Sequence, residues 1–461
     1  MNLNHINVIA RYEVKLVKRS WLFRIFAILA LLFISAIMLG YQTGIVNRMD
    51  NLWPRIAVSS LMPFCNTYFY NIAQSVIVVF LAGSFLKRDK KLDTAEVIYV
   101  RPMSNADYIV GKTWGIVKVF ITLNIITLLF TAFLNILINK SPFDLFPYLF
   151  YLLTISVPSL LFVLGLSFTA MCILKNQAVT FIVMLGIIGT VFFYLTDTLY
   201  GVFDFFGVNI PAIFSDVTGH ADLRLFLLQR FSYLLAGIGL ISMTIALVKR
   251  LPHKPWKIAV VYTFSSLFLL AACLGGLLYI LHYNHQLDLR NQYITTFDKY
   301  ADAPHVDLLV NDLSVTPRGD RLAGKSTVKV VNNNTEVLDK IIFYLNPELT
   351  VTSVEMAGKN LLFRRDHQVI EVDQPIQQQE ELTLTINYEG KISENICYTD
   401  VLTEDYLDTK VPQVFWRFGK RYAWLSNTFT LLTPECIWYP VTIAPVNPGA
   451  PYNVRKNFTD Y

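Results

Sequence analysis

One stretch of the sequence fits the loosest form of a nucleotide-binding motif. Residues 106–113 read Ala-Asp-Tyr-Ile-Val-Gly-Lys-Thr, which is the spacing of a Walker A loop with Ala106 in place of its first glycine. A working loop of this kind follows a buried strand and opens a helix, so that backbone amides surround the phosphates. Here no strand pattern precedes Ala106, and an apolar run of membrane-spanning length follows Thr113. We therefore expect no nucleotide binding on this chain.

The histidines and serines form no catalytic pattern. His282 and His285 have the i, i+3 spacing of one helix face, but two ligands fall short of a zinc site. His305 and His367 stand alone, and the sequence contains neither an H-E-x-x-H string nor a G-x-S-x-G elbow. The sequence thus predicts no enzyme activity, no bound metal and no cofactor.

The five cysteines are too few and too scattered for a disulfide framework or a zinc ribbon. Cys65, Cys172 and Cys273 lie in or beside apolar stretches, where a buried thiol is the expected form. Cys397 and Cys436 lie in the polar part of the chain and could pair if that part is outside the cytoplasm. The sequence says nothing about their distance, so this disulfide stays open.

The composition differs between the two parts of the chain, and this difference predicts the structural elements that position these residues. Of 461 residues, 54% are hydrophobic and 16% are charged, against roughly 25% charged in ordinary soluble domains. Residues 1–282 are long apolar stretches, whereas residues 283–461 read as soluble sequence. The sequence predicts an α-helical polytopic membrane domain over 1–282 and an extracytoplasmic β-rich domain over 283–461.

The apolar stretches predict both the number of spans and their orientation. Seven reach the about 20 apolar residues that a span needs: 21–41, 66–86, 114–138, 146–173, 178–196, 230–248 and 258–281. Lys and Arg crowd the segment before the first stretch and the loops after the second and sixth. The positive-inside rule then predicts a cytoplasmic N-terminus and an external C-terminal domain, in the lipid bilayer of a bacterial inner membrane.

The distribution of charges argues against proton-coupled transport and against nucleic-acid binding. The spans hold almost no ionisable residue away from their ends, so no intramembrane proton relay is expected. Energy for transport would then come from another subunit. The net charge of +5 is mainly an orientation signal, and no basic soluble segment is present that would bind nucleic acid.

The loop between the second and third spans predicts a short helix at the membrane surface. Asp93 or Thr94 can cap this helix and Pro102 ends it. Its apolar face is formed by Leu92, Ala95, Ile98 and Tyr99. A second polar start at 104–107 leads through Gly111 and Lys112 into the third span.

This loop resembles the coupling-helix region of ABC transporter permeases of the type-2 exporter class. The matching residues are Arg88, Asp89, Thr94, Pro102, Asp107, Gly111 and Lys112. Residues 3–20 resemble the basic amphipathic segment that precedes the first span in that family, whereas the family often has a glycine where this chain has residues 91–93. A plain charged loop that obeys the positive-inside rule is the alternative.

The resemblance implies a permease subunit of an ATP-driven exporter. Loop 88–112 would contact a separate ABC ATPase subunit, with Leu92, Ile98 and Tyr99 as apolar contacts and Arg88, Asp89, Thr94, Pro102, Gly111 and Lys112 as matching positions. One permease half cannot enclose a pathway, so a homodimer or a second permease half is implied.

The polar part of the chain predicts an antiparallel β-sandwich or saddle. Alternating patterns run over 306–315, 327–331, 338–345, 349–356, 369–372 and 382–388, and turn signals separate them. Residues 322–324, 345–354 and 387–392 resemble the N-terminal β-saddle of aminopeptidase N-like zinc peptidases.

That resemblance stops before the catalytic part of the peptidase family, because its H-E-x-x-H helix has no counterpart here. The last residues, 457–461, read like the opening of another strand. The alternative function is therefore a membrane-anchored peptidase-like protein, a split or truncated permease–aminopeptidase fusion with a binding or scaffold role.

Overall fold

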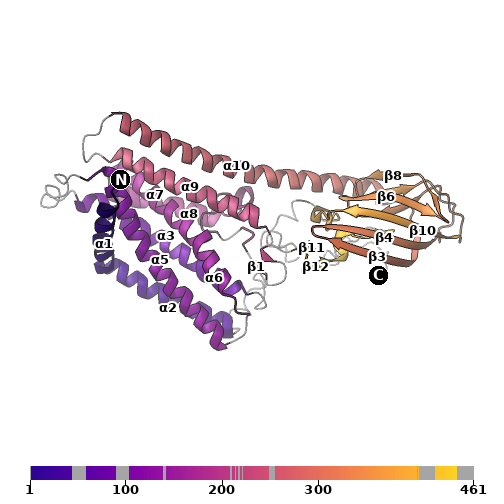
Figure 1. Ribbon diagram of the computed structural model, residues 1–461, viewed down its shortest axis with the longest axis horizontal. Helices are drawn as coiled ribbons and strands as arrows, with labels where there is room; N and C mark the ends of the chain where they lie inside the picture. The colour runs from indigo at the N-terminus through magenta and orange to yellow at the C-terminus, as the bar shows by residue number, and fades with distance from the viewer. Residues whose placement is uncertain are drawn as a thin grey trace. The chain divides into compact units, whose positions relative to one another are not determined.

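The computed structural model describes residues 2–43, 59–89, 103–138, 142–207, 210–212, 214–215, 219–220, 222–248, 255–401, 403 and 421–443. It divides the chain into two compact units, with the division between Leu281 and His282. We call the described residues up to Leu281 the helical unit and those from His282 the β unit. Figure 1 draws the helices in indigo to pink and most strands in orange.

The helical unit contains long apolar helices joined by turns. Their bounds are α1 Leu3–Arg19, α2 Trp21–Thr43, α3 Leu61–Asp89, α5 Asn105–Ile138, α6 Leu145–Tyr151, α7 Val157–Leu174, α8 Gln177–Thr190, α9 Leu223–Leu247 and α10 Pro255–Tyr300. Among the described residues, seven helical stretches are long and apolar enough to cross a membrane. The prediction of several long apolar helices followed by a β-sheet domain is confirmed.

The fourth apolar stretch is one helix with a local change of winding. A π-helical turn, Leu152–Ser156, joins α6 to α7, whose second residue is Pro158. Proline has no N–H to donate, so the regular ladder is interrupted at this point. The next turn is tight, because Lys175 adopts a φ of 56° and the Asn176 side chain caps α8.

Helices α7 and α9 pack backbone to backbone through two glycines. A Cβ atom on Gly165 would lie 2.8 Å from the carbonyl oxygen of Gly237. A Cβ atom on Gly237 would lie 2.7 Å from the carbonyl carbon of Leu161. Any side chain at either position would separate the helices, so the crossing requires small residues.

The β unit consists mainly of two antiparallel sheets that share one core. The larger sheet has the order β3-β4-β10-β6-β7, with bounds Asp307–Arg318, Arg321–Val331, Glu381–Gly390, Leu349–Met356 and Lys359–Asn360. The smaller has the order β5-β9-β8, with bounds Ile341–Tyr344, Val369–Val372 and Phe363–Asp366. Buried Val328, Ile386, Phe343 and Ile370 belong to the common core.

Two short hairpins complete the strands of the described residues. Strands β11 Ala423–Leu425 and β12 Thr430–Leu432 pair in the β unit. Strands β1 Phe214–Ser215 and β2 Gly219–His220 pair in the helical unit.

The expectation of strand-like structure directly after residue 282 is wrong. Helix α10 continues to Tyr300, and the first strand of the β unit begins at Asp307. Residues Tyr293, Phe297 and Tyr300 are buried at helical spacing. Tyr293 and Tyr300 pack in a second core that includes Tyr344, Val369 and Ile437. Tertiary packing explains the continued helix where local polarity indicated its end.

Arg290 on this part of α10 holds a segment of irregular backbone. Its guanidinium is buried and donates to the carbonyl oxygens of Asn395, Cys397, Tyr398 and Val401. These carbonyls lie at the end of a 3-10 turn and just beyond it, where no strand supplies donors. A single arginine thereby satisfies acceptors that folding removes from water.

Replacing Arg290 by Ala is expected to destabilise the β unit by about 3 kcal/mol, because several buried carbonyls lose their donor. The measurement is chemical denaturation of the full chain in detergent, followed by β-sheet circular dichroism. Arg318→Ala is the matched control, since Arg318 is exposed at the end of β3. Equal midpoints for the two variants would contradict this role.

Candidate functional site

The start of α5 is fixed by a reciprocal pair of hydrogen bonds. Ser104 Oγ accepts the N–H of Asp107 at 3.0 Å, and Asp107 Oδ2 accepts the N–H of Ser104 at 3.2 Å. This is a capping box, which satisfies amides that the first helical turn leaves unpaired. It confirms the polar helix start that the sequence predicts at 104–107.

The same carboxylate binds the beginning of α1. Asp107 Oδ1 accepts the backbone N–H of Asn2 at 2.8 Å, although 105 residues separate them in sequence. His5 Nδ1 lies 3.7 Å from Asp107 Oδ2. Asp107 therefore caps the start of α5 and binds the start of α1.

Helix α1 packs against α5 (Figure 1). Two glycines of α5, Gly111 and Gly115, form a notch at this contact. A Cβ atom on Gly111 would lie 2.8 Å from the Cβ of Ile9. A Cβ atom on Gly115 would lie 2.7 Å from the Cβ of Glu13 and 2.9 Å from the carbonyl oxygen of Ala10. Residues four apart share one helix face, so the glycines let α1 approach the α5 backbone closely.

A buried ion pair lies beside the notch. Lys112 Nζ is 3.8 Å from Glu13 Oε2, and the two side chains are only 5% and 3% exposed. The same ammonium lies 4.9 Å from the centroid of the Tyr108 ring. Removing one partner of such a pair leaves a charge in a poorly hydrated place, which is costly. We call the contact made by Asp107, Gly111, Lys112 and Gly115 with α1 the docking face.

Two of the site residues predicted from the sequence lie in the docking face. Gly111 and Lys112 lie together, and both contact α1. Arg88 and Asp89 are the last residues of α3. Leu92, Thr94, Ile98, Tyr99 and Pro102 lie outside the described residues, so their coupling role stays a prediction.

Sequence reasoning missed Glu13 as the partner of Lys112. Glu13 occupies the buried face of α1 together with Ile6, Ala10 and Val17. This spacing is a helical stripe, and one acidic residue within an apolar stripe is the signal that would have found it. The opposite face exposes Arg11, Lys15, Lys18 and Arg19.

The sixth apolar stretch begins earlier than the predicted residue 230, which places one ionisable residue, Arg230, inside it. Helix α9 begins at Leu223 instead of 230, which places Arg230 two turns inside the helix and only 1% exposed. Its guanidinium donates to the carbonyl oxygens of Asp204 and Phe205, and its Nε to Gln229 Oε1. The sequence reading failed because it placed the apolar boundary too late.

Arg230 is one of several donors to an irregular segment over 198–207, which begins with a distorted 3-10 turn, Thr198–Gly201. Leu199 and Tyr200 both have positive φ angles there. The carbonyls of this segment accept from side chains of four helices: Asn71 of α3 to Phe206, Ser159 of α7 to Phe205, Gln229 and Tyr233 of α9 to Gly201 and Val202, and Tyr279 of α10 to Tyr200. Irregular backbone is tolerated among apolar helices only when it is satisfied in this way.

In the β unit, Cys397 and Cys436 lie close together without a bond. Their Sγ atoms are 3.4 Å apart, both residues are buried, and both thiols are free. Burial raises the pKa of the Cys397 thiol well above its usual value. Their pairing stays a prediction. No group of three metal-ligating side chains occurs among the residues that the structure describes.

Lys112→Met is expected to destabilise the helical unit by about 3 kcal/mol, because Glu13 keeps its charge in the buried contact. Glu13→Leu combined with Lys112→Met should recover most of that loss. The measurement is thermal unfolding of the purified full chain, with Lys118→Met as a control on the same helix. A double variant less stable than Lys112→Met would contradict the pairing.

Comparisons with known proteins leave the family of the chain open. No protein-family model and no curated protein matches it. The M1 zinc metallopeptidase from Deinococcus radiodurans, and a mutant of it bound to a Tyr-Ser-Ala substrate, are each 24% identical over 19% of this chain. The TM-score is 0.18, and the chain covers 21% of those structures. The likeness is local and carries no argument about activity.

Proposed function

We propose that this chain is the permease subunit of an ATP-driven exporter in a bacterial inner membrane, with its N-terminus in the cytoplasm. The long apolar helices and the resemblance of loop 88–112 to a coupling region support this proposal. A separate ATPase chain supplies the energy, and a homodimer or a second half completes the pathway. The external β unit serves as a binding module.

The docking face is the observation that carries the proposal. Helix α5 has 34 residues and is thus about 51 Å long, whereas the hydrocarbon core of a bilayer is about 30 Å thick. In the proposed orientation its first turns therefore reach the inner surface of the membrane, where α1 binds them. A force on the loop before α5 would move α5 and α1 together, because Asp107 and the buried ion pair join them.

The exposed face of α1 fits the inner surface of the membrane. Its basic residues Arg11, Lys15, Lys18 and Arg19 are exposed on the face away from α5. A helix face with several exposed Lys and Arg residues is attracted to a leaflet that contains anionic lipids. Helix α1 would then brace α5 at the surface instead of crossing the membrane.

The 198–207 segment, whose carbonyls accept side-chain hydrogen bonds, bears on the external end of the proposed permease. It follows α8, and α9 begins at Leu223, so it lies at the end of the helical unit away from the docking face. In the proposed orientation this is the external end. Its carbonyls accept hydrogen bonds from side chains on α3, α7, α9 and α10, so the segment is held against the bundle.

The test replaces the apolar contacts of the loop. Ile98→Asp with Tyr99→Ala is expected to break ATPase binding at a cost of about 2–4 kcal/mol, because small interfaces depend on a few buried anchors. The full chain is purified from its native host, and the co-purifying ATPase and its ATP turnover are measured. Insertion should survive, since these residues lie outside the predicted hydrocarbon spans.

The matched control is Ile98→Leu with Tyr99→Phe, which keeps apolar surface at both positions. It should bind the ATPase like the unchanged chain. If the Asp and Ala variant also binds and turns over ATP normally, the loop is only an orientation signal. That result would favour the alternative, a membrane-anchored peptidase-like protein. A topology reporter fused after Asp460 would still test the external position of the β unit.

A further inference from the structure

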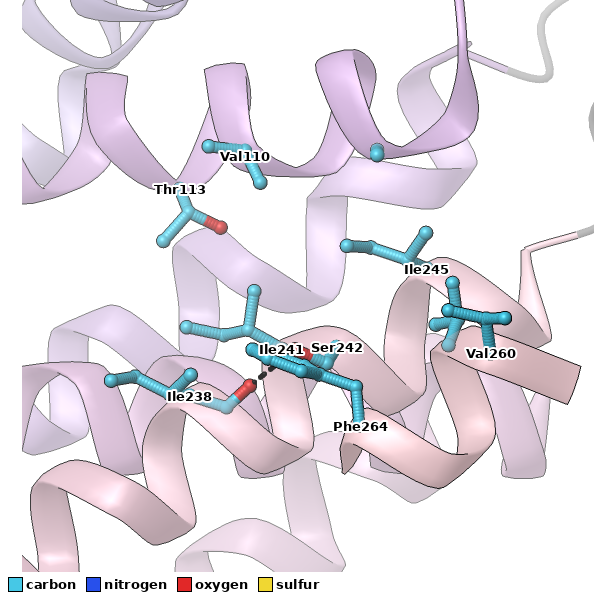
Figure 2. Close-up of a pocket in the computed structure, with 10 residues that line it drawn as sticks. Val110, Thr113, Ile238, Ile241, Ser242, Ile245, Val260 and Phe264 are labelled. Atoms are coloured by element: carbon cyan, nitrogen blue, oxygen red, sulfur yellow. Dashed lines mark hydrogen bonds between the residues drawn. The ribbon is translucent and has the colours of Figure 1, made fainter. Parts of the chain in front are cut away.

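A cavity of about 440 Å³ lies between three helices of the helical unit. Its walls come from the beginning of α5, the last third of α9 and the first turns of α10 (Figure 2). The volume falls within the range of about 300–1,000 Å³ that is typical of small-molecule sites. It lies on a different face of α5 from the docking face, since Val110 and Thr113 line it while Gly111 and Gly115 meet α1.

The cavity walls are apolar and suit a hydrocarbon ligand. Two lining residues have hydroxyl groups, and both donate within their own helices. Thr113 Oγ1 donates to the Ile109 carbonyl at 2.9 Å, and Ser242 Oγ to the Ile238 carbonyl at 2.8 Å (Figure 2). The other lining side chains are apolar, so a water molecule would find too few partners there.

The α10 wall also faces outward from the bundle. Val260 and Phe264 line the cavity but keep 57% and 48% of their surface exposed. A chain-like molecule lying along α10 could therefore enter sideways. An empty apolar space of this size would forfeit dispersion contacts on all of its walls.

A cation and an indole lie on α10 about one turn before the residues that line the cavity. Lys257 precedes Val260 by three residues and Val261 by four, which puts it on the lining face of α10 and about 4.5 Å nearer the helix start. Lys257 Nζ is 5.7 Å from the centroid of the Trp256 ring, and Trp256 is exposed. Tryptophan and lysine at a helix end are typical of the headgroup level of a bilayer.

We propose that this cavity binds one acyl chain of an anionic phospholipid from the inner leaflet, with its phosphate at Lys257. The proposal rests on the membrane placement proposed above. It is independent of the coupling role of loop 88–112. The apolar walls select the acyl chain, and the positive charge of Lys257 selects the anionic headgroup.

The test uses phosphatidylglycerol with a photoreactive diazirine in the middle of one acyl chain, and the matching phosphatidylcholine. The full chain is reconstituted in nanodiscs and irradiated, and its labelled peptides are identified by mass spectrometry. Labelling is expected at 106–113 and 238–245, about fivefold more with phosphatidylglycerol, which is the effect of one charge near the surface.

Two variants fill the cavity from different helices. Ala106→Phe and Ser242→Leu should each reduce labelling of these peptides at least tenfold. Ala259→Phe is the matched control, because Ala259 is exposed on α10 and does not line the cavity. Using two filling variants keeps the test valid if one of them fails to fold.

A charge variant tests the headgroup. Lys257→Gln should remove the preference for phosphatidylglycerol, whereas Lys118→Gln should keep it. Lys118 is a fair control because its Nζ lies 4.9 Å from the Trp114 ring, a similar pairing away from the cavity.

Three outcomes would overturn the proposal. They are equal labelling by the two lipids, labelling unchanged by both filling variants, and labelling confined to the outward residues Leu267 and Leu270 of α10. The last outcome would still support membrane placement, because both residues are exposed on an apolar helix. A chain unlabelled on every apolar helix would instead contradict the membrane placement itself.

Discussion

A carbonyl group that folding removes from water must find a donor, and this requirement shapes both units of the molecule. Each unit meets it with one fully buried arginine. Arg230 donates to two carbonyls of the 198–207 segment, and Arg290 donates to four carbonyls between Asn395 and Val401. In both places the backbone is irregular, so neither helix nor sheet could supply the donors. The guanidinium, with five N–H groups in a plane, is the side chain best suited to this task.

The helical unit has close contacts of two kinds at its two ends. At the docking face, glycines on α5 admit α1, and a buried ion pair fixes the register of the two helices. At the other end, the 198–207 segment accepts hydrogen bonds from side chains of four helices: Asn71, Ser159, Gln229 and Tyr279. Between these ends, Gly165 and Gly237 hold α7 against α9. Close contacts thus occur at both ends of the bundle and in its middle, which is the arrangement that the proposed coupling between the loop and the transport path needs.

Much of this architecture was predictable because its signals are local. The apolar helices follow from composition over about 20 residues, and the alternation at 349–356 and 369–372 agrees with β6 and β9 residue for residue. The helical course of 283–300 was not predictable, since packing of Tyr293 and Tyr300 on distant strands decides it. The partner of Lys112 was missed for the same reason, because about a hundred residues separate it from Glu13. Arg230 was missed because a slightly misplaced helix boundary hid its depth.

The choice of arginine at position 230 has a consequence for how the protein responds to acidity. A guanidinium remains protonated at any pH a cell experiences, whereas a histidine or a carboxylate would gain or lose its proton. The charge that holds the 198–207 segment is therefore permanent. The hydrogen bonds from Arg230 to the carbonyls of Asp204 and Phe205 therefore persist over the whole range of pH in which the protein stays folded.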